Sequence, residues 1–249
     1  MGRKIIKMHF NLVTIFPELI DDFVSHGIIS NAISKKKLSI STWNPRQYSE
    51  DKNGRLDDKP YGGGPGMILQ PDPIIKTVEA IKRKDETYVI CMAPHGKVIN
   101  QRKLLDLSQK KNITIISGRY EGIDNRVEES CVDEVCSAGD YILNGGELPA
   151  LILLEGISRL VEGILGDENS ILEESFNDGL LEFPQYTRPE NSEYGNVPEV
   201  LLNGNHSDIR RWRLKESLRR TLSLRPDLME SRQLTSEEKE LIDEIKGEG

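Results

Sequence analysis

Three glycine-bearing segments lie within fifty-five residues of one another, at positions 92–96, 118–124 and 137–146, and each follows a short apolar run. Glycine lets the main chain approach a ligand closely because it has no Cβ, and the backbone N–H groups of such loops can hydrogen-bond a small molecule. The spacing therefore favours a binding site for a small cofactor that is built largely from peptide groups.

The same segments limit the kind of ligand. Glycines after strands are common turn residues that need no ligand, but three such segments in succession favour one shared pocket. None has the G-x-G-x-x-G spacing of dinucleotide-binding loops or the G-x-x-x-x-G-K-[ST] spacing of phosphate loops. We expect the ligand to be neither a dinucleotide nor a nucleoside triphosphate.

Alternating strand and helix patterns position these segments. The predicted elements are strands 8–16 and 38–43, helix 73–84, strand 87–92, helix 101–109, strand 112–117, helix 124–130, strand 132–136 and helix 147–161. This order predicts an α/β fold with a parallel sheet flanked by helices. Ligands of such sheets bind outside the carboxyl ends of the strands, which is where the glycine segments follow.

Two further stretches within residues 1–161 bear on function. Residues 44–66 are rich in Asp, Lys, Gly and Pro, and we expect a long loop without regular elements that contacts substrate, in preference to a plain linker. An apolar stripe on helix 147–161 is broad enough to pack against a second subunit, although the chain's own core would explain it equally well. The stripe consists of Leu148, Leu151, Ile152, Leu154, Ile157 and Leu160.

Composition excludes several classes of protein. The chain has 249 residues, a net charge of −8 and three cysteines in no zinc-binding pattern, which we expect to be buried, reduced thiols. No stretch has the roughly 18 apolar residues of a membrane helix, and the N-terminus has no long apolar signal region. These features predict a soluble, cytoplasmic protein without a membrane partner.

The charge is unevenly distributed. Residues 160–187 contain seven acidic residues and no Lys or Arg, whereas residues 203–225 contain seven basic and two acidic residues. Helices are predicted at 207–224 and 236–245. We therefore predict an α/β domain at 1–160, a flexible acidic linker at 161–182 and a small helical domain at 183–249, whose basic helix suits a polyanion.

Five segments, 60–67, 118–124, 139–147, 184–189 and 204–213, closely resemble the bacterial tRNA (guanine-N1)-methyltransferases, in the right order and over nearly the whole chain. The resemblance implies a deep trefoil knot in the α/β domain and a homodimer whose active sites draw on both chains. It implies methyl transfer from S-adenosylmethionine to N1 of guanine at tRNA position 37, beside the anticodon, with a dependence on magnesium whose ligands it does not identify.

The resemblance also implies catalytic residues. N1 of guanine carries a proton, so transfer needs a general base and a group that stabilises charge on O6. Asp178 matches the family's base, Arg159 its arginine near the guanine, and Glu121 an active-site acid. From the residues alone, Asp178 is one more carboxylate of an acidic linker and Arg159 a solvated residue at a helix end. We expect apolar neighbours to bury Asp178 partly, and the linker to order only when tRNA docks.

Residues of the glycine segments match the family's cofactor pocket, with mostly backbone contacts implied. They are Met92, Pro94, Gly96, Gly118, Tyr120, Gly122, Ser137, Ala138, Gly139, Tyr141, Ile142, Leu143, Gly145, Gly146 and Pro149. The residues implied for tRNA binding are Tyr61, Gly62, Gly63, His206, Arg210, Arg211 and Trp212, with Arg213, Arg219 and Arg220 as further phosphate contacts. Two structural alternatives stay open: Trp212 could belong to the core, and the basic helix could be an ordinary solvated helix. Two functional alternatives also stay open: a related knotted methyltransferase that acts on a ribose 2′-hydroxyl or another RNA base, and a non-catalytic RNA-binding protein.

Overall fold

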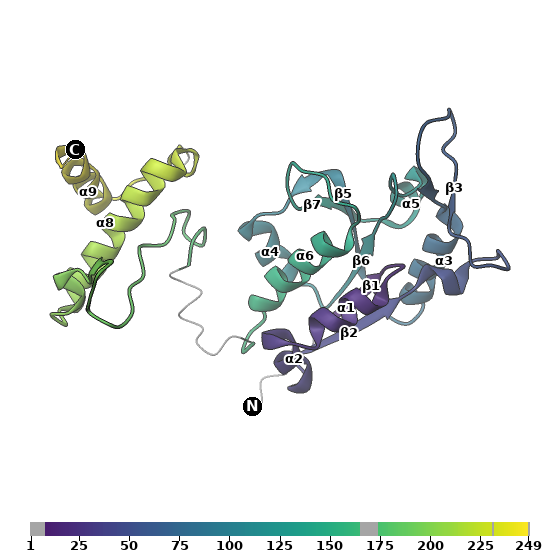
Figure 1. Ribbon diagram of the computed structural model, residues 1–249, viewed down its shortest axis with the longest axis horizontal. Helices are drawn as coiled ribbons and strands as arrows, with labels where there is room; N and C mark the ends of the chain where they lie inside the picture. Colours follow the sequence, from purple (N-terminus) through teal and green to yellow (C-terminus); the bar gives the residue numbers. More distant parts are fainter. Residues whose placement is uncertain (1–7, 165–173, 231, 249) are drawn as a thin grey trace. The chain divides into compact units, whose positions relative to one another are not determined.

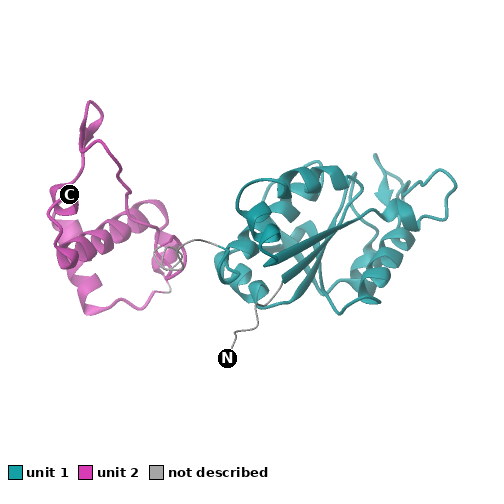
Figure 2. Ribbon diagram, turned by 90° about the horizontal axis from the view of Figure 1, so that it is seen from below, with its two compact units in different colours: residues 1–166 teal, residues 167–249 magenta. Residues whose placement is uncertain are grey.

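The computed structural model describes residues 8–164, 174–230 and 232–248. The chain divides into two compact units, Met1–Gly166 and Asp167–Gly249, drawn in teal and magenta in Figure 2. Residues 165–173 of the predicted linker lie outside the described residues, so the predicted division at 160 and 182 stays a prediction.

Unit 1 is built on a five-stranded sheet in which every neighbouring pair runs parallel, which confirms the predicted α/β class. The strands lie in the order β2-β1-β6-β5-β7 (Figure 1). Their bounds are β1 Met8–Val13, β2 Leu38–Trp43, β5 Tyr88–Val98, β6 Asn112–Ser117 and β7 Glu134–Ser137. The central strand β6 has consecutive branched residues, Ile115 and Ile116, because both of its faces are buried.

Helices cover both faces of this sheet. Their bounds are α1 Pro17–Val24, α2 Gly27–Ser34, α3 Pro71–Lys82, α4 Gln101–Ser108, α5 Asn125–Cys131 and α6 Glu147–Arg159. Helices α1, α2, α4 and α6 share one hydrophobic core with the sheet, and α3 and α5 share the other. Side chains alternate along β1, so Phe10 and Leu12 enter the first core and Val13 the second.

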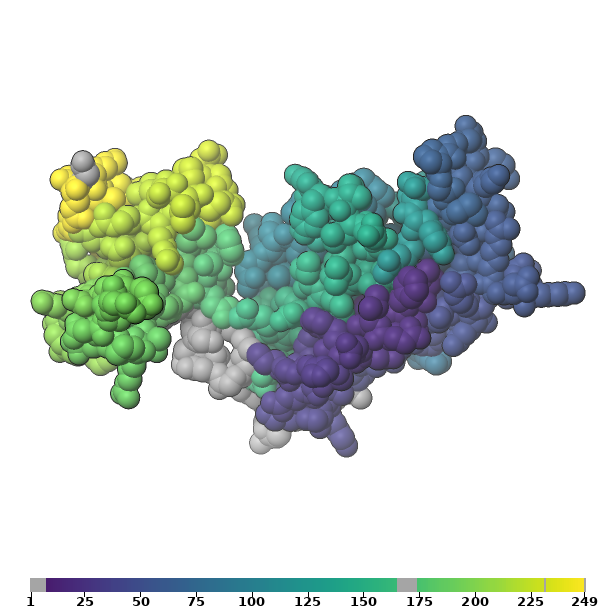
Figure 3. All heavy atoms as spheres, viewed as in Figure 1, coloured from purple at the N-terminus to yellow at the C-terminus, as the bar shows by residue number. Residues whose placement is uncertain are grey.

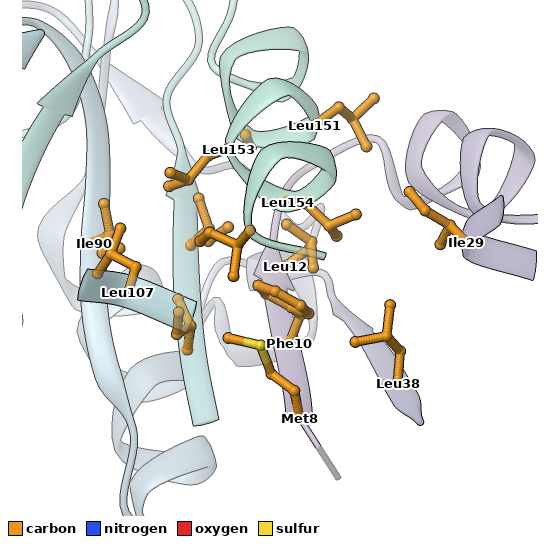
Figure 4. Close-up of a cluster of buried hydrophobic side chains, with 14 of the residues drawn as sticks. Met8, Phe10, Leu12, Ile29, Leu38, Ile90, Leu107, Leu151, Leu153 and Leu154 are labelled. Carbon is orange, nitrogen blue, oxygen red and sulfur yellow. The ribbon is translucent and has the colours of Figure 1, made fainter. Parts of the chain in front are cut away.

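Helix α6 is anchored on the sheet by fully buried leucines. Figure 4 shows Leu154 of α6 close to Leu12 of β1, and Leu153 on another side of the helix within the same core; both leucines, Phe10 and Leu12 are inaccessible to solvent. This packing holds the N-terminal end of α6 next to the loops that follow β6 and β7, since Gly146 donates a backbone hydrogen bond to Gly118 (2.8 Å).

Three expectations for unit 1 are wrong in detail. Strand β5 does not end at residue 92 but continues to Val98, with a bulge between Met92 and Lys97 beside Cys136, so residues 92–96 are not a loop. The long loop 44–66 does contain short regular elements, a 3-10 helix at Pro45–Tyr48 and strand β3 at Asp57–Asp58, because β3 pairs with β4 at Ile68–Leu69. Helix α6 ends at Arg159, two residues early.

The described part of unit 2 contains two longer helices, α8 His206–Leu224 and α9 Ser236–Gly247. The Asn205 side chain caps α8, and Thr235 and Glu238 form a capping box on α9. Shorter elements are β8 Asn191–Ser192, β9 Gly195–Asn196 and two 3-10 helices at Glu199–Leu201 and Pro226–Met229. A core of Leu180, Leu218, Leu241 and Ile242 joins the helices to the segment that precedes them. No helix in the described part of either unit is long and apolar enough to cross a bilayer.

Candidate functional site

The glycine segments do meet at one cavity, of about 350 Å³, which lies beside residues 91–95 within β5 and beside the loops that follow β6 and β7. The predicted cofactor residues that line it are Met92, Pro94, Gly118, Tyr120, Gly122, Ser137, Ala138, Gly139, Tyr141, Ile142, Leu143, Gly145, Gly146 and Pro149. Its volume falls within the range of small-molecule pockets, roughly 300 to 1,000 Å³. The predicted shared pocket is therefore present in unit 1.

Gly96 is the exception among the predicted cofactor residues, because it does not line the cavity. A Cβ built at Gly96 would lie 2.6 Å from the backbone N and C atoms of Cys136. The glycine therefore serves the close approach of β5 to β7, and its assignment to ligand binding is not supported by its position.

The cavity combines apolar walls with peptide groups. Met92, Ile142, Leu143 and Pro149 supply apolar surface. Tyr120 adopts a left-handed backbone conformation (φ 61°), which is uncommon for a residue other than glycine and is typical of functional loops. Such walls suit a flat heterocycle whose polar edge is hydrogen-bonded by the main chain.

Several side chains that line this cavity were not predicted as pocket residues, among them Cys91, His95, Arg119, Glu128 and Cys136. The two cysteines were expected to be buried thiols, and both are buried and free. His95 pairs with Glu128 across 3.1 Å. Burial raises the pKa of the Cys91 thiol to about 12 and that of Cys136 to about 11, so neither is a thiolate nucleophile at neutral pH. All of these residues except Glu128 are adjacent in sequence to a predicted cofactor residue, and this adjacency was the signal that could have identified them.

Arg119 belongs to a buried ionic cluster at the edge of the cavity. Its Nε donates to Glu147 Oε2 (2.8 Å), and Glu147, 1% exposed, accepts a second hydrogen bond from Thr14 Oγ1 (2.8 Å). The Arg119 guanidinium also lies 4.6 Å from the centre of the Phe16 ring. The cluster ties the end of β1 to the loop after β6 and to the first turn of α6.

Glu121 lies exposed at the edge of the same cavity. Its backbone N–H donates to Met67 O (3.0 Å), and its side chain packs over Gly66, where a Cβ would lie 2.3 Å from it. These contacts hold the end of the long loop 44–66, which is rich in glycine, beside the cavity. Tyr61 within that loop is fully exposed, and Gly62 and Gly63 adopt positive φ with open space around them.

Arg159 and Asp178 do not line the cavity. Arg159 ends α6, ten residues after Pro149, which places it about 15 Å further along the helix axis. There it lines a separate hollow with Phe23, His26 and Glu155. Within one chain, then, α6 holds Arg159 at the opposite end from the cavity.

Asp178 belongs to unit 2, and its expected partial burial is wrong, since its side chain is 61% exposed. Its Oδ1 accepts from Leu180 N (3.1 Å), while Arg232 lies 3.4 Å from Oδ2 and also donates to the Asp178 carbonyl oxygen. Arg232 is in turn held by buried Glu238. The Asp178 loop is therefore tied to the N-terminal end of α9.

A second cavity, of about 570 Å³, lies wholly within unit 2 and includes Asp178. Its wall from α8 carries His206, Arg210 and Arg213, and the Arg213 guanidinium lies 4.6 Å from the centre of the Phe183 ring. Trp212 is half-buried and its ring is 6.3 Å from that of Tyr186, so it is neither a fully buried core residue nor an isolated surface aromatic.

The basic face of α8 is paired with acidic residues of α9. Arg211 contacts Glu240 (2.9 Å) and Glu244 (2.6 Å), and Lys215 contacts Glu244 (2.8 Å) and Glu248 (2.7 Å). Arg210 likewise pairs with Glu237, and Arg219 with Glu248. The predicted phosphate-binding side chains therefore already have anionic partners in the free protein, a feature that counting charges along the sequence could not reveal.

A metal site is absent from the described residues, in the sense that no three His, Cys, Asp or Glu side chains there are placed to hold an ion. The magnesium dependence implied by the resemblance stays a prediction, and no step of the chemistry below is assigned to a metal.

Comparison with known proteins identifies the family. Residues 8–231 match the family model described as tRNA (Guanine-1)-methyltransferase TrmD. Relatives named tRNA (guanine-N(1)-)-methyltransferase include one from Pseudoalteromonas atlantica, 46% identical over 96% of this chain and 91% of the relative. Others are from Dictyoglomus turgidum, 46% identical over 97% and 98%, and Vibrio cholerae, 46% identical over 95% and 97%. The chain that builds this cavity belongs to the tRNA (guanine-1)-methyltransferase family.

Proposed function

We propose that this protein transfers the methyl group of S-adenosylmethionine to N1 of guanine at position 37 of tRNA, next to the anticodon. The observation that carries the proposal is the cavity between the middle of β5 and the loops that follow β6 and β7, in a chain whose family relatives are named for guanine-N1 methylation of tRNA.

The cavity fits the adenosyl part of the donor in size and chemistry. Adenine needs flat apolar walls and a few main-chain hydrogen-bond partners, and the glycine segments provide both. Close backbone packing there depends on missing side chains, since a Cβ at Gly146 would lie 2.8 Å from the Gly118 nitrogen. When bound, the donor supplies an electrophilic methyl group on its sulfonium.

Two side chains act on the guanine. Asp178 accepts the N1 proton, so that the N1 lone pair can attack the methyl carbon, and the Arg159 guanidinium donates to O6, where negative charge develops. The exposure of Asp178 is compatible with this role, because the carboxylate stays accessible to a docking nucleotide. Glu121, on the cavity edge beside the glycine loop, is positioned to contact the same substrate.

A second copy of the chain completes the site. Arg159 is separated from the donor cavity by the length of α6, so one chain alone does not offer both to a single guanine. Leu148 (62% exposed) and Ile152 (50% exposed) leave one side of α6 apolar and uncovered, whereas Leu151, Leu154 and Ile157 face the core. Large apolar side chains exposed on a monomer mark an interaction surface. We assign this side of α6 to the homodimer interface.

Neighbouring surface extends this apolar side. Helices α1 and α6 are in contact, and their purple and green atoms adjoin on the face drawn in Figure 3. Phe16, which precedes α1, and Leu19 on α1 are also exposed, as is Ile142 in the loop before α6. Burial of this continuous surface by a partner would remove all of these side chains from water.

We further propose that the carboxyl part of unit 1 is threaded as the trefoil knot of this family. Antiparallel bridging of Arg119 with Gly145, and the hydrogen bond from Gly146 to Gly118, support the interlocking of the loops after β6 and β7.

Unit 2 is the proposed small helical domain and binds the anticodon arm. For Arg211 and its neighbours on α8 to contact phosphates, they must exchange carboxylates of α9 for phosphate oxygens, and such contacts are sensitive to salt. His206, Trp212 and Tyr61 are proposed to stack on unpaired nucleotides, as aromatic residues of RNA-binding proteins do.

The test is a methylation assay with labelled S-adenosylmethionine and tRNA that carries guanine or adenine at position 37, followed by location of the methyl group. Methylation of N1 only in the guanine substrate is expected. Methyl on a ribose 2′-hydroxyl, or none in either tRNA, would reject the proposal.

Asp178→Asn tests the base separately. The substitution keeps the side chain's shape but removes the proton acceptor, so we expect methyl transfer to fall by about 10²- to 10⁴-fold, the usual range for a general base. Affinity for S-adenosylhomocysteine should be unchanged. Activity equal to wild type would rule out this residue as the base.

A further inference from the structure

Arg119 lies in the loop after β6, and the chemistry proposed above does not use it. Its side chain lines the donor cavity and also an adjoining hollow. The other residues of that hollow are Ile15, Phe16, Tyr120, Glu121, Ile142, Leu143 and Asn144. The guanidinium thus stands at the boundary between the proposed adenosyl site and a second space that opens beside it.

The structure holds this guanidinium in one orientation. Its Nε is engaged by Glu147 at 2.8 Å, and the Glu147 carboxylate is itself fixed by Thr14. The guanidinium stacks on Phe16 and passes close to Gly145, where a Cβ would lie 2.3 Å from Nε. Because a buried ion pair costs desolvation energy and is weak evidence of stabilisation, its presence here points to a positioning role.

The engaged Nε leaves most of the guanidinium's donors available. Of five N–H groups, only the one on Nε makes a hydrogen bond within the described residues, and the side chain is 23% exposed. The other basic side chain among the described residues that line the cavity and the hollow is His95, which faces Glu128. Arg119, which is always protonated in proteins, is therefore the positively charged side chain available to a donor bound in this cavity.

We propose that the terminal amino groups of Arg119 bind the carboxylate of the methionine part of the donor, with Glu147 as the residue that positions them. This inference rests on the proposed function. The carboxylate is the donor's single anionic group, and a planar guanidinium matches a carboxylate through two parallel hydrogen bonds. With adenine among the glycine segments, the methionine tail extends toward the hollow.

The experiment compares two ligands that differ only in this group. S-adenosylhomocysteine and its decarboxylated analogue, which keeps the amine, thioether and adenosine, are titrated calorimetrically into the full-length protein. The variant is Arg119→Met combined with Glu147→Gln, which removes both charges and so leaves no buried carboxylate unpaired. Arg119→Lys, which keeps the charge but loses the planar fork, is the second variant and serves alone if the double variant does not fold.

Wild type should prefer the carboxylate-bearing ligand by about 10- to 100-fold, as expected for hydrogen bonds to a charged group. The double variant should lose this preference while binding the decarboxylated analogue within about 3-fold of wild type, and Arg119→Lys should retain part of it. A merely structural role would weaken both ligands equally.

Four results would overturn the inference. Equal loss for both ligands makes Arg119 structural, and an unchanged preference places the carboxylate elsewhere. A change confined to the KM for tRNA assigns Arg119 to an RNA phosphate. If neither ligand binds the wild type, the donor site itself is rejected, and this inference with it, so the two failures are distinguishable.

Discussion

Gly96→Ala separates two explanations of a glycine beside a ligand cavity: contact with ligand and contact between strands. An added Cβ at Gly96 would meet three backbone atoms of Val135 and Cys136 at 2.6 to 2.7 Å. Ordinary contact begins at 3.4 Å, so the deficit is about 0.8 Å (3.4 Å less 2.6 Å). Backbone atoms within a sheet cannot rotate away, so β5 and β7 must separate.

The substitution should lower the free energy of unfolding by about 1 to 3 kcal/mol, as overpacking a core does. For a chain of this size, each kcal/mol lowers Tm by roughly 2 to 4 °C, so a fall of about 2 to 12 °C is expected for unit 1. Thermal unfolding of the full-length protein, followed by circular dichroism, measures it. Gly96 adopts no positive φ, so the effect of alanine is steric alone.

Gly247→Ala is the matched control, because a Cβ there meets nothing within 4 Å and φ is again not positive. It should leave Tm within about 1 °C of wild type, or raise it slightly, since alanine favours helix over glycine. A Gly96→Ala protein as stable as this control would refute the assignment of Gly96 to strand packing.

Three further outcomes are expected. Arg211→Met should weaken tRNA binding and reduce the slope of log affinity against log salt by about 1. An unchanged slope would show that Arg211 only pairs with the glutamates of α9 and does not contact a phosphate. Hydrogen bonds from Arg211 and Lys215 lower the pKa of Glu244 to about 2 from 4.5, so its contribution to stability is present above pH 4.5 and is lost as pH falls toward 2. Urea unfolding at pH 7 and pH 3 should therefore show a smaller acid-induced loss in Glu244→Gln than in wild type, and equal losses would contradict this. Ile152→Asp should yield monomers in sedimentation analysis without methylation activity, whereas Leu105→Asp, at an equally exposed position on α4, should leave the dimer intact.

The arrangement of α6 explains why a second chain is central to the proposed function. One end of this helix carries Gly146 and Pro149 beside the donor cavity, and the other end carries Arg159. A rigid helix cannot bring its two ends to the same nucleotide, so in the proposed dimer the arginine of one chain serves the cavity of the other. The apolar residues between the ends supply the surface through which two such helices could approach.

Local patterns in the sequence determined most of the framework. Apolar periodicity, capping residues and the glycines and prolines at element ends predicted strands β2 and β6 and helix α8, because these signals act over a few residues. The meeting of segments 118–124 and 137–146 was predictable, since parallel strands place their following loops at one edge of a sheet, whereas segment 92–96 reaches the same cavity from within β5. Family-specific motifs, more than periodicity, pointed to guanine methylation.

Tertiary structure alone decided which side chains meet. Thr14 and Glu147 are 133 residues apart, and Arg211 and Glu244 are 33 apart, and neither pairing leaves a trace in local sequence. Gly96 resembled a cofactor-pocket residue of the family, as its neighbours Met92 and Pro94 do, yet the packing of β7 against β5 gives it a different role. The physical reason is range: backbone propensities are set by adjacent residues, whereas the partner of a charge or the space beside a glycine is set by how whole elements pack.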